Sequence, residues 1–323
     1  MRYLSLFSGI GGFEVAIHQV FGNKAECVAY SEIDKHAITE YERHYPNHQN
    51  LGDVTKIKKK DIDGLGRIDL VVAGFPCSDL SSVKHKDRQG LDGTKSGLFW
   101  TMLKIMKWAK TINPDLKFII ENNASMAHKW RDMITDELTK LFHKKVYCNY
   151  FDSSQWVVQR RRRYYWTLSE IPEYKGKRKQ NMNDVLIPIA EAKKFTLSDK
   201  AIAYLNASPS HLISKHGEII IKKDNCYLKQ KVPYPTRLST RGSSTKNDYI
   251  SCLVTKYDSC FLLDYRLCKG EHSFLPRYLA KTEFNNLFGY PKNYIKNDHT
   301  TIFTRLYGMS VVPLVIKYIL NHI

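Results

Sequence analysis

Near its amino terminus the chain reads YLSLFSGIGGFE, residues 3–14. An apolar run, Tyr3–Phe7, leads directly into Gly9, Gly11 and Gly12, and a helical pattern follows. Glycine tolerates the backbone angles of a tight turn and lets a ligand come close to the main chain. The segment therefore predicts a β-strand, a glycine-rich turn and a helix, which is the opening unit of an α/β fold.

The first half of the chain repeats this alternation of short apolar runs and helical patterns, which predicts βαβ units and a mostly parallel sheet. Two of the intervening segments, Leu98–Ala109 and Ile134–Phe142, carry apolar residues on one helical face. The strands are expected at Tyr3–Phe7, Cys27–Ser31, Asp69–Ala73, Phe118–Glu121, Val146–Phe151 and Arg163–Leu168.

The pattern changes after about Pro172. A charged, linker-like stretch at 175–180 precedes an irregular mixture of Tyr, Lys, Ser and Asn, and helical patterns return at Tyr278–Phe288 and Val311–Leu320. We therefore expect three parts, which are a main domain over residues 1–172, a second, smaller domain over 173–275, and a C-terminal segment over 276–323 that returns to the first domain.

The charge of the chain is strongly basic. Its 323 residues include 50 Lys and Arg against 32 Asp and Glu, a formal net charge of +18. The excess is uneven, because residues 193–246 hold eleven basic and three acidic side chains. Such an excess favours a polyanionic partner such as nucleic acid. A solvated basic face explains the charge alone equally well.

The cysteines and the hydropathy pattern exclude several classes of protein. The seven cysteines are scattered without a C-x-x-C pair, so neither a disulfide framework nor a zinc site is signalled, and we expect no metal. No window has the ~18 apolar residues of a transmembrane helix, and the amino terminus lacks the layout of a signal peptide. We therefore expect a cytoplasmic protein without membrane attachment, in which one thiol can serve as a nucleophile.

The second predicted strand leads to an acidic residue, Glu32. It lies about 20 residues after the glycine turn, where an acid can bind ribose hydroxyls. Nicotinamide-dependent enzymes place an acid similarly, but the spacing here is not G-x-G-x-x-G, because position 14 is Glu. This counts against NAD and leaves S-adenosylmethionine open. By itself the glycine cluster is a weak signal that a structural turn explains equally well.

Two further predicted strands end near residues that could take part in catalysis. The stretch VAGFPCSDLS, residues 72–81, places Cys77 just beyond a strand end, at the edge of an α/β sheet where ligands bind. A free Cys is usually a small buried hydrophobe, but the flanking Gly-Phe-Pro and the polar loop favour a presented thiol. The strand FIIENN, residues 118–123, ends similarly at Glu121, which is either a general acid or an ordinary acid at a strand–helix turn.

A run of four arginines, Arg160–Arg163, follows Gln159 and precedes an aromatic strand. Such a run suits phosphate or base contacts, although a solvated basic segment is the alternative. Alternate side chains of an extended segment point in opposite directions. Arg161 and Arg163 can therefore face a site while their neighbours face solvent.

In this order, the motifs resemble those of the DNA cytosine-5 methyltransferase family, which has a tRNA-methylating branch, over nearly the whole chain. Phe7–Gly12 resembles the F-x-G-x-G-G donor loop, Gly74–Cys77 the start of the catalytic loop, and Glu121-Asn122 the E-N-V motif. The resemblance continues at 159–163 with Q-x-R-x-R, at 195–198 with the opening of the target-recognition region, at 277–294 with the motif that supports this region, and at 306–313 with the C-terminal G-N-S-V motif.

The resemblance implies a fold and a reaction. The fold would be a Rossmann-like S-adenosylmethionine-dependent methyltransferase sheet, with residues 173–275 as the target-recognition domain. Cys77 would add to C6 of a cytosine flipped out of duplex DNA, Glu121 would hold and protonate N3, and Arg161 with Arg163 would orient the base.

The resemblance also implies two sets of binding residues. S-adenosylmethionine would be bound by Phe7, Gly9, Gly11, Gly12, Glu32, Ile33, Asp53, Val54, Pro76, Leu98 and Val311. The candidate DNA contacts are Ser81, Arg237, Arg241 and Lys246, because Arg is the commonest reader of guanine. The loop Ser78–Ser96 is expected to close over the flipped base.

The sequence departs from the family pattern at three places and leaves alternatives open. The catalytic loop reads P-C-S-D-L-S instead of the commoner P-C-Q-x-F-S, which is nearer to the loop of the animal de novo enzymes, and Asn123 replaces the usual Val. Met309 replaces the Asn of G-N-S-V, which could weaken donor binding because the hydrogen bonds of an amide are lost.

The alternatives are a tRNA cytosine-5 methyltransferase and a catalytically weak DNA-binding relative. The roughly 100 residues before Arg277 favour a DNA-reading domain. The expected partner is duplex DNA in the nucleoid. A cognate restriction endonuclease is a further candidate partner, and a monomer is the default expectation.

Overall fold

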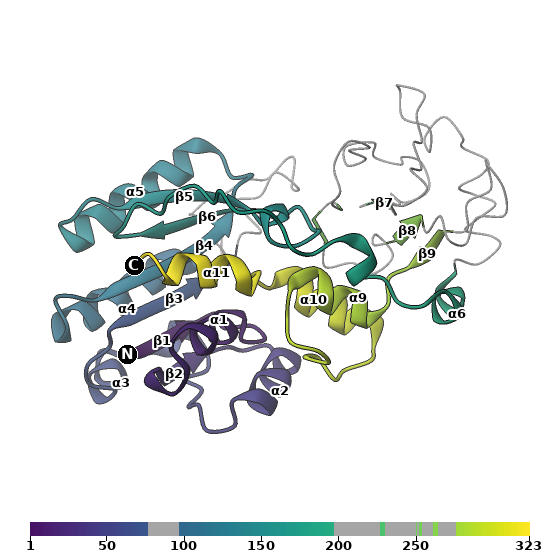
Figure 1. The fold of residues 1–323 in the computed structure, drawn as a ribbon. Coiled ribbons are helices and arrows are strands. Elements are labelled where there is room, and N and C mark those ends of the chain that lie inside the picture. Colours follow the sequence, from purple (N-terminus) through teal and green to yellow (C-terminus); the bar gives the residue numbers. More distant parts are fainter. Residues whose placement is uncertain (77–96, 197–226, 230–249, 251, 254–260, 264–275) are drawn as a thin grey trace. The chain divides into compact units, whose positions relative to one another are not determined.

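The computed structural model describes residues 1–76, 97–196, 227–229, 250, 252–253, 261–263 and 276–323 (Figure 1). The chain divides into two compact units. Unit 1 comprises Met1–Asp152, Arg162–Tyr174 and Val311–Ile323, and unit 2 comprises Ser153–Arg161 and Lys175–Ser310. The final residues of the chain therefore belong to the same unit as its amino terminus. The predicted domain boundaries near residues 172 and 275 remain a prediction.

Unit 1 is built on a six-stranded sheet with the order β2-β1-β3-β4-β6-β5. Its first four strands in this order pair in parallel, and β6 is antiparallel to both β4 and β5. The strands are β1 (Arg2–Leu6), β2 (Glu26–Ser31), β3 (Leu70–Gly74), β4 (Lys117–Asn123), β5 (Tyr147–Asp152) and β6 (Arg162–Thr167). Each lies within two residues of its predicted range, and the α/β class with a mostly parallel sheet is confirmed.

The direction of β6 follows from the length of the segment before it. Only residues 153–161 join Asp152 to Arg162, and a parallel crossover needs about a dozen residues or more. The chain therefore returns antiparallel to β5. As a result, the beginning of β6 lies beside the end of β4, where Asn123 pairs with Arg163.

Helices cover both faces of this sheet (Figure 1). They are α1 (Gly12–Phe21), α2 (Lys35–His44), α3 (Lys59–Gly64), α4 (Leu98–Ile112), α5 (His128–Phe142) and α11 (Pro313–Leu320). The buried faces of α4 and α5, including Met102 and Ile134, pack in one apolar cluster with Val71 and Ile120 of the sheet. On the opposite face α1 packs against α11. The predicted apolar faces of α4 and α5 are thus confirmed as core.

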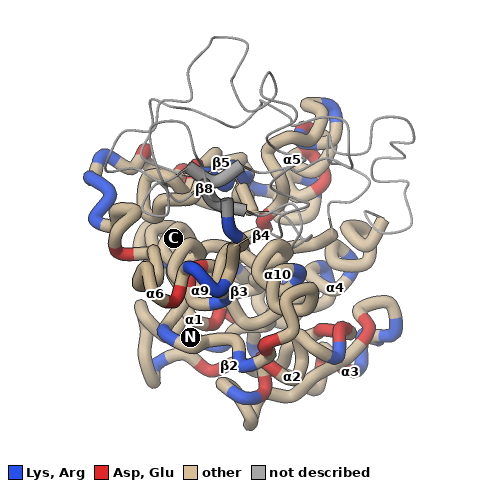
Figure 2. The backbone as a smooth tube through the Cα atoms, turned by 90° about the vertical axis from the view of Figure 1, so that its right-hand side faces the viewer, with Lys and Arg blue, Asp and Glu red and all other residues tan. Residues whose placement is uncertain are grey.

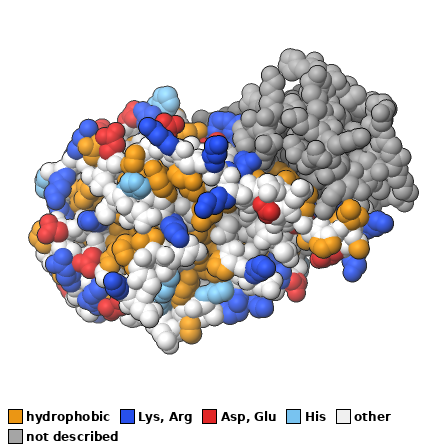
Figure 3. Space-filling model, viewed as in Figure 1, with side chains coloured by type: hydrophobic (Ala, Val, Ile, Leu, Met, Phe, Trp, Pro, Cys, Tyr) orange, Lys and Arg blue, Asp and Glu red, His pale blue; other side chains and the backbone are white. Residues whose placement is uncertain are grey.

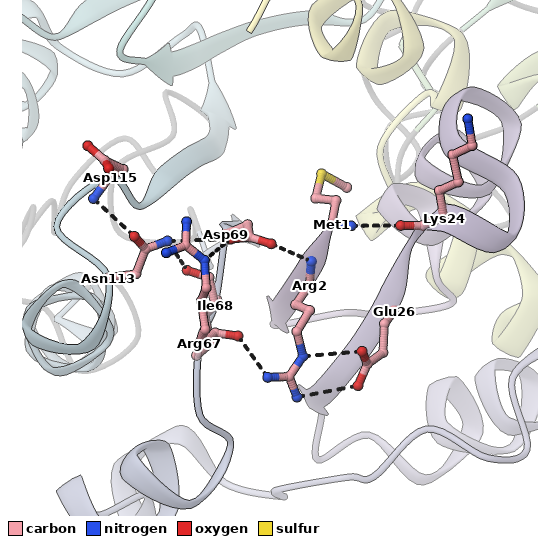
Figure 4. Close-up of polar contacts among 9 residues, drawn as sticks. All are labelled: Met1, Arg2, Lys24, Glu26, Arg67, Ile68, Asp69, Asn113 and Asp115. Atoms are coloured by element: carbon pink, nitrogen blue, oxygen red, sulfur yellow. Dashed lines mark hydrogen bonds and ion pairs between the residues drawn. The ribbon is translucent and has the colours of Figure 1, made fainter.

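Polar groups join the amino-terminal ends of the parallel strands (Figure 4). The Asp69 carboxylate accepts hydrogen bonds from the Arg2 N–H (2.9 Å) and from Arg67 Nε (2.8 Å), while the Arg2 guanidinium pairs with Glu26 (3.2 Å). Burial by itself would raise the pKa of Asp69. The hydrogen bonds from Arg2 and Arg67, with the charge of Arg67, lower that pKa below its usual value. This network stabilises the edge of the sheet that is opposite to the carboxyl ends of the strands.

Unit 2 contains a three-stranded antiparallel sheet and three described α-helices. The elements are β7 (Tyr227–Lys229), β8 (Phe261–Leu263), β9 (Pro276–Tyr278), α6 (Ile189–Ala192), α9 (Lys281–Phe288) and α10 (Thr300–Met309). The helix expected over 278–288 begins only at Lys281, because β9 occupies the residues before it. The sequence patterns did not identify α10.

A buried ion pair organises the described part of unit 2. Arg277 on β9 and Glu283 on α9 are fully buried and make two hydrogen bonds of 2.6 and 2.7 Å. Glu283 also accepts the N–H groups of Ala280 (2.9 Å) and Ile187 (3.1 Å). Additional hydrogen bonds offset the loss of solvation of a buried ion pair. Removal of one partner leaves an unpaired buried charge and strongly lowers the stability of the fold.

The basic excess of the chain lies mainly in unit 2. By sequence, unit 2 carries 25 Lys and Arg against 11 Asp and Glu, whereas unit 1 carries 25 against 21. In unit 1 the two signs are interspersed, for example along α2 and α3 in Figure 2 and over the face shown in Figure 3. The net charge that favours a polyanionic partner is therefore concentrated in one unit.

One stretch of the described residues, Thr300–Leu320, is long and apolar enough to cross a membrane by length and composition, and 61% of it is buried. This stretch differs from the sequence-based expectation that no window is apolar enough to span a membrane. The stretch is interrupted at 310–312, so it forms α10 and α11, which belong to different units.

Candidate active site

The glycine-rich turn after β1 has the strained backbone expected of a ligand-binding loop. Phe7, Gly9 and Gly11 have positive φ angles of 55°, 56° and 85°. Gly11 occupies the N-cap position of α1, and Gly12 begins the helix. A positive φ at a residue other than glycine, as at Phe7, is costly and tends to persist at functional sites.

The turn is tied to the carboxylate of Glu32, which follows β2. The Gly9 N–H donates to Glu32 Oε2 at 2.8 Å. The N–H groups of Ile33 and Asp34 donate to Oε1 at 2.8 and 2.9 Å. Hydrogen bonds from backbone N–H groups favour the ionised form of a carboxylate. The structure thus brings together the predicted donor loop and the predicted ribose-binding acid.

A second loop is attached to the same place by Asn50, a residue that the sequence motifs did not single out. Asn50 Oδ1 accepts the N–H groups of Glu32 (3.3 Å) and Gly52 (2.9 Å), and its Nδ2 donates to the Glu32 carbonyl (3.2 Å). Ser31 Oγ donates to the Gly52 carbonyl at 2.5 Å. These bonds hold the segment before Asp53 against the end of β2. A single Asn in a polar loop carries no sequence signal for this contact.

Asp53 begins the short 3-10 helix η2 (Val54–Lys56). Its Oδ1 accepts the N–H (2.9 Å) and the hydroxyl (2.8 Å) of Thr55, and these two bonds lower the pKa of Asp53. The carboxylate is therefore ionised at neutral pH.

The apolar residues predicted to bind the donor occupy different environments within unit 1. Phe7, Val54 and Leu98 belong to one apolar cluster, which also contains buried Phe75 and Phe99. Ile33 is 68% exposed next to Glu32. Pro76 is half-buried after β3, and Val311 is buried before α11.

A carboxylate and a guanidinium meet at the carboxyl edge of the sheet. Glu121, the fifth residue of β4, is 9% exposed, and its Oε1 lies 2.7 Å from Nε of Arg163 on β6. Gly74 pairs with Glu121 in the adjacent strand β3. A Cβ atom at position 74 would lie 3.2 Å from Glu121 Oε2. Only glycine leaves this oxygen undisturbed beside the segment that leads to Pro76.

Asn122 fixes the backbone of that segment. Its Nδ2 donates to the Phe75 carbonyl at 3.1 Å, and both groups are buried. The end of β4 therefore positions the chain just before the predicted nucleophile, Cys77.

The two predicted catalytic arginines have different surroundings. Arg161 is buried in unit 2, where its guanidinium donates to the carbonyls of Gly308 (2.8 Å) and Leu253 (3.4 Å) and lies over the Phe288 ring. Arg162 is exposed and pairs with Asp152 at 3.1 Å. The side chains at these two positions thus alternate between buried and exposed, and the expectation that Arg161 and Arg163 both face a site stays a prediction. The described contacts place Arg163, but not Arg161, against Glu121.

Comparison with known protein families shows which family this chain belongs to. The whole chain, residues 1–323, matches the family described as C-5 cytosine-specific DNA methylase. The chain belongs to this family. The resemblance inferred from the motifs is thereby confirmed.

Individual methylases resemble the chain to different extents. The type II methyltransferase M.HhaI of Haemophilus parahaemolyticus is 26% identical over 340 residues, which cover 100% of this chain and 94% of that protein. The orphan methyltransferase M.Rho11sI of Bacillus phage rho11s is 42% identical over 109 residues, or 33% of this chain. In that alignment the chain spans about a fifth of the phage protein, 20% of its length.

Solved structures support the fold. The DNMT2 mutant of Spodoptera frugiperda superimposes with a TM-score of 0.67 at 17% identity, over 99% of this chain and 98% of that chain. The S. pombe Dnmt2 methyltransferase gives the same TM-score at 16% identity, over 99% and 97%. The methyltransferase fold, a mostly parallel sheet with a second unit, is therefore confirmed.

Several predicted residues of this methylase lie outside the described residues. These are Cys77 and the rest of the loop to Ser96, including Ser81, and the candidate DNA contacts Arg237, Arg241 and Lys246. Their roles remain predictions. Among the residues that are described, no group of three or more His, Cys, Asp or Glu side chains could hold a metal ion.

The departure at Met309 concerns an exposed side chain. Met309 is 56% exposed, and it is the preceding carbonyl, that of Gly308, that accepts a hydrogen bond from Arg161. The next residue, Ser310, hydrogen-bonds through its hydroxyl to Tyr290. The backbone around Met309 is thus held by contacts that its side chain does not make.

Proposed function

We propose that this methylase transfers a methyl group from S-adenosylmethionine to C5 of a cytosine flipped out of duplex DNA, with Cys77 as the covalent nucleophile. The observation that carries the proposal is the Glu121–Arg163 pair beside Gly74, at the strand ends that lead to Cys77. A carboxyl group and a guanidinium at the sheet edge that precedes Cys77 in the sequence match the needs of thiol addition to a pyrimidine ring.

The residues at the glycine turn fit the proposed donor. Glu32, held by backbone N–H groups at the turn, suits ribose hydroxyls, and the exposed Ile33 next to it offers an apolar surface to an adenine ring. The ionised Asp53, with Val54 and Leu98 of the neighbouring cluster, would complete this side. The turn from Phe7 to Gly12, Pro76 and Val311 are proposed to line the rest of the pocket. When bound, S-adenosylmethionine supplies the methyl group.

The chain's own residues would activate the cytosine. The Cys77 thiolate forms a bond to C6, and the electron pair of the C5–C6 double bond makes C5 nucleophilic. Glu121 donates a proton to N3 as charge builds there. Arg163 orients Glu121 and stabilises negative charge on the ring. After C5 has taken the methyl group, the C5 proton passes to water, the thiolate leaves C6, and the N3 proton returns to Glu121, which restores the aromatic ring.

Arg161 is proposed to act differently from Arg163. Its hydrogen bonds to the Gly308 and Leu253 carbonyls favour a positioning role, in which it holds together segments of unit 2 that are distant in sequence. The contact of Arg163 with Glu121 instead favours a direct role at the base.

The basic unit 2 is proposed to bind duplex DNA. Its 25 Lys and Arg against 11 acids suit a phosphate backbone, and Arg237, Arg241 and Lys246, together with Ser81 of the catalytic loop, are the proposed contacts. We further propose a cytoplasmic monomer that acts on nucleoid DNA. A restriction endonuclease of the same system is a candidate partner.

Transfer of a labelled methyl group to duplex DNA and to tRNA, measured in parallel, tests the proposal. The DNA proposal expects label in DNA, lost in Cys77→Ser and reduced at least 100-fold in Glu121→Gln, by the scale of general acid catalysis. Arg162→Lys, which changes an exposed neighbour of Arg163, is the matched control. Label in tRNA alone would favour the alternative that the likeness to DNMT2 structures keeps open. Label in neither would favour the inactive relative.

A further inference from the structure

A buried chain of hydrogen bonds lies behind the glycine turn. Tyr41, on α2, is fully buried, and its hydroxyl donates to Glu14 Oε1 at 3.1 Å. The same hydroxyl lies 3.0 Å from Nδ1 of His48. Glu14 is also fully buried, on the first turn of α1. Tyr41 thus joins two groups that come from different segments of the chain.

Glu14 and His48, the two ends of this series of hydrogen bonds, each lie in or next to a loop of the proposed donor pocket. Glu14 follows the glycine turn by two residues, on the helix that Gly11 caps. His48 lies two residues before Asn50, which is bonded to Glu32 and Gly52. The two loops are otherwise joined through Glu32. Tyr41 therefore connects, from within the core, the two walls between which the donor would sit.

The protons of the hydrogen-bonded series Glu14–Tyr41–His48 can be arranged in two ways. A hydroxyl has one proton, so when Tyr41 donates to Glu14, the bond to His48 requires a proton on Nδ1. When the Glu14 carboxyl is protonated, it can donate to Tyr41, and Tyr41 can donate to an unprotonated Nδ1. Both arrangements keep both bonds.

Other titratable groups face this chain from the surrounding elements. Tyr3 and Cys27 lie in the adjacent strands, and Cys27 Sγ is 3.9 Å from the Tyr41 hydroxyl. The Tyr45 ring stacks on His48 with a centroid distance of 5.0 Å, and His18 packs against both rings. Burial raises the pKa of Glu14 to about 7 and lowers that of His48 to about 4. Near neutral pH the His48 imidazole is therefore neutral, and the Glu14 carboxyl is partly protonated.

We propose that Tyr41 is a positioning residue for donor binding, which holds the glycine turn and the 45–53 loop in register through Glu14 and His48. The inference rests on the proposed function, because it assigns the space between these loops to S-adenosylmethionine. It adds residues that contact no substrate. Loss of the hydroxyl should weaken donor affinity while chemistry at saturating donor is retained.

Tyr41→Phe tests this role, with Tyr30→Phe as its matched control. The two rings stack at a centroid distance of 4.0 Å, but the Tyr30 hydroxyl donates to Glu42 instead of joining the chain. We expect Tyr41→Phe to raise the Kd for S-adenosylmethionine, measured by calorimetry, about tenfold. Its kcat at saturating donor should stay within about twofold of wild type. Tyr30→Phe should bind the donor as wild type does.

His48→Phe keeps the ring stack on Tyr45 and removes Nδ1, so it tests the chain from its more exposed end. It should also raise the donor Kd, and Glu14→Gln, whose amide still accepts from Tyr41, should not. If Tyr41→Phe fails to fold, the donor Kd of His48→Phe tests the inference in its place. Wild-type donor affinity in folded Tyr41→Phe or in His48→Phe would overturn the inference and leave the proposed function intact. A wild-type protein that binds no donor would overturn both.

Discussion

Glu14 makes the stability of unit 1 depend on pH in a way that one substitution can isolate. Its carboxyl is fully buried, and burial raises its pKa from 4.5 to about 7. Between these values the folded protein holds a proton that the unfolded chain has lost. The stabilisation is therefore complete below about pH 4.5 and is lost as the pH rises through about 7.

The magnitude follows from the size of the shift. One pKa unit corresponds to about 1.4 kcal/mol, so ionisation of Glu14 reduces the free energy of unfolding by about 2 to 3 kcal/mol between pH 5 and pH 8. Glu14→Gln keeps the shape of the side chain and carries no charge at any pH. The free energy of unfolding of the variant, relative to that of wild type, should therefore rise by this amount from pH 5 to pH 8.

Urea unfolding of both proteins at pH 5, 6, 7 and 8 measures the effect. Groups distant from Glu14 contribute equally to the two curves and cancel in the difference. Glu42→Gln, at an exposed position of α2, is the control and should stay within about 0.5 kcal/mol of wild type. A difference between Glu14→Gln and wild type that does not change from pH 5 to pH 8 would show that Glu14 does not ionise with a raised pKa in the folded protein.

Three further predictions concern the sheet edges. Gly74→Ala should lower kcat/KM for methyl transfer by roughly 10- to 100-fold, because its Cβ displaces Glu121 Oε2, while the melting temperature stays nearly unchanged; normal activity would contradict the assigned geometry. Arg163→Lys should lower kcat by roughly 100-fold, because the Nε contact to Glu121 is lost, and Arg162→Lys should have little effect in the same assay. Asp69→Asn should lower the free energy of unfolding by about 1 to 2 kcal/mol at pH 7, in urea titrations, without loss of activity; the difference should shrink as acid protonates Asp69.

The elements that could be predicted from the sequence are those determined by local apolar pattern. The strand ending at Gly74 and the helix beginning at Leu98 bury regular apolar residues; the strand was located within one residue, and the predicted helical segment begins where the helix begins. The rule that ligands bind at the carboxyl edge of a parallel sheet then placed Glu32 and Glu121 correctly at strand ends.

What could not be predicted depends on contacts between distant segments. The pairing of Arg163 with Glu121 needs β6 to run antiparallel, which follows only from the short connection at 153–161. Tyr41 carried no signal, because a Tyr on an amphipathic helix is ordinary core, and its function depends on Glu14 and His48. The strand β9 was missed because its three residues, Pro276–Tyr278, are too few to show a period.

Trapping of the covalent adduct tests whether Cys77 attacks C6 of a cytosine in duplex DNA. A duplex containing 5-fluorocytosine at its target cytosines cannot lose a C5 proton after methyl transfer, so the bond to the enzyme should persist. With S-adenosylmethionine present, we predict a complex that survives denaturation and maps by peptide mass to Cys77, and we predict none with Cys77→Ser. Failure of the wild-type protein to form such a complex on DNA that it methylates, or a complex that persists in Cys77→Ser, would contradict the account.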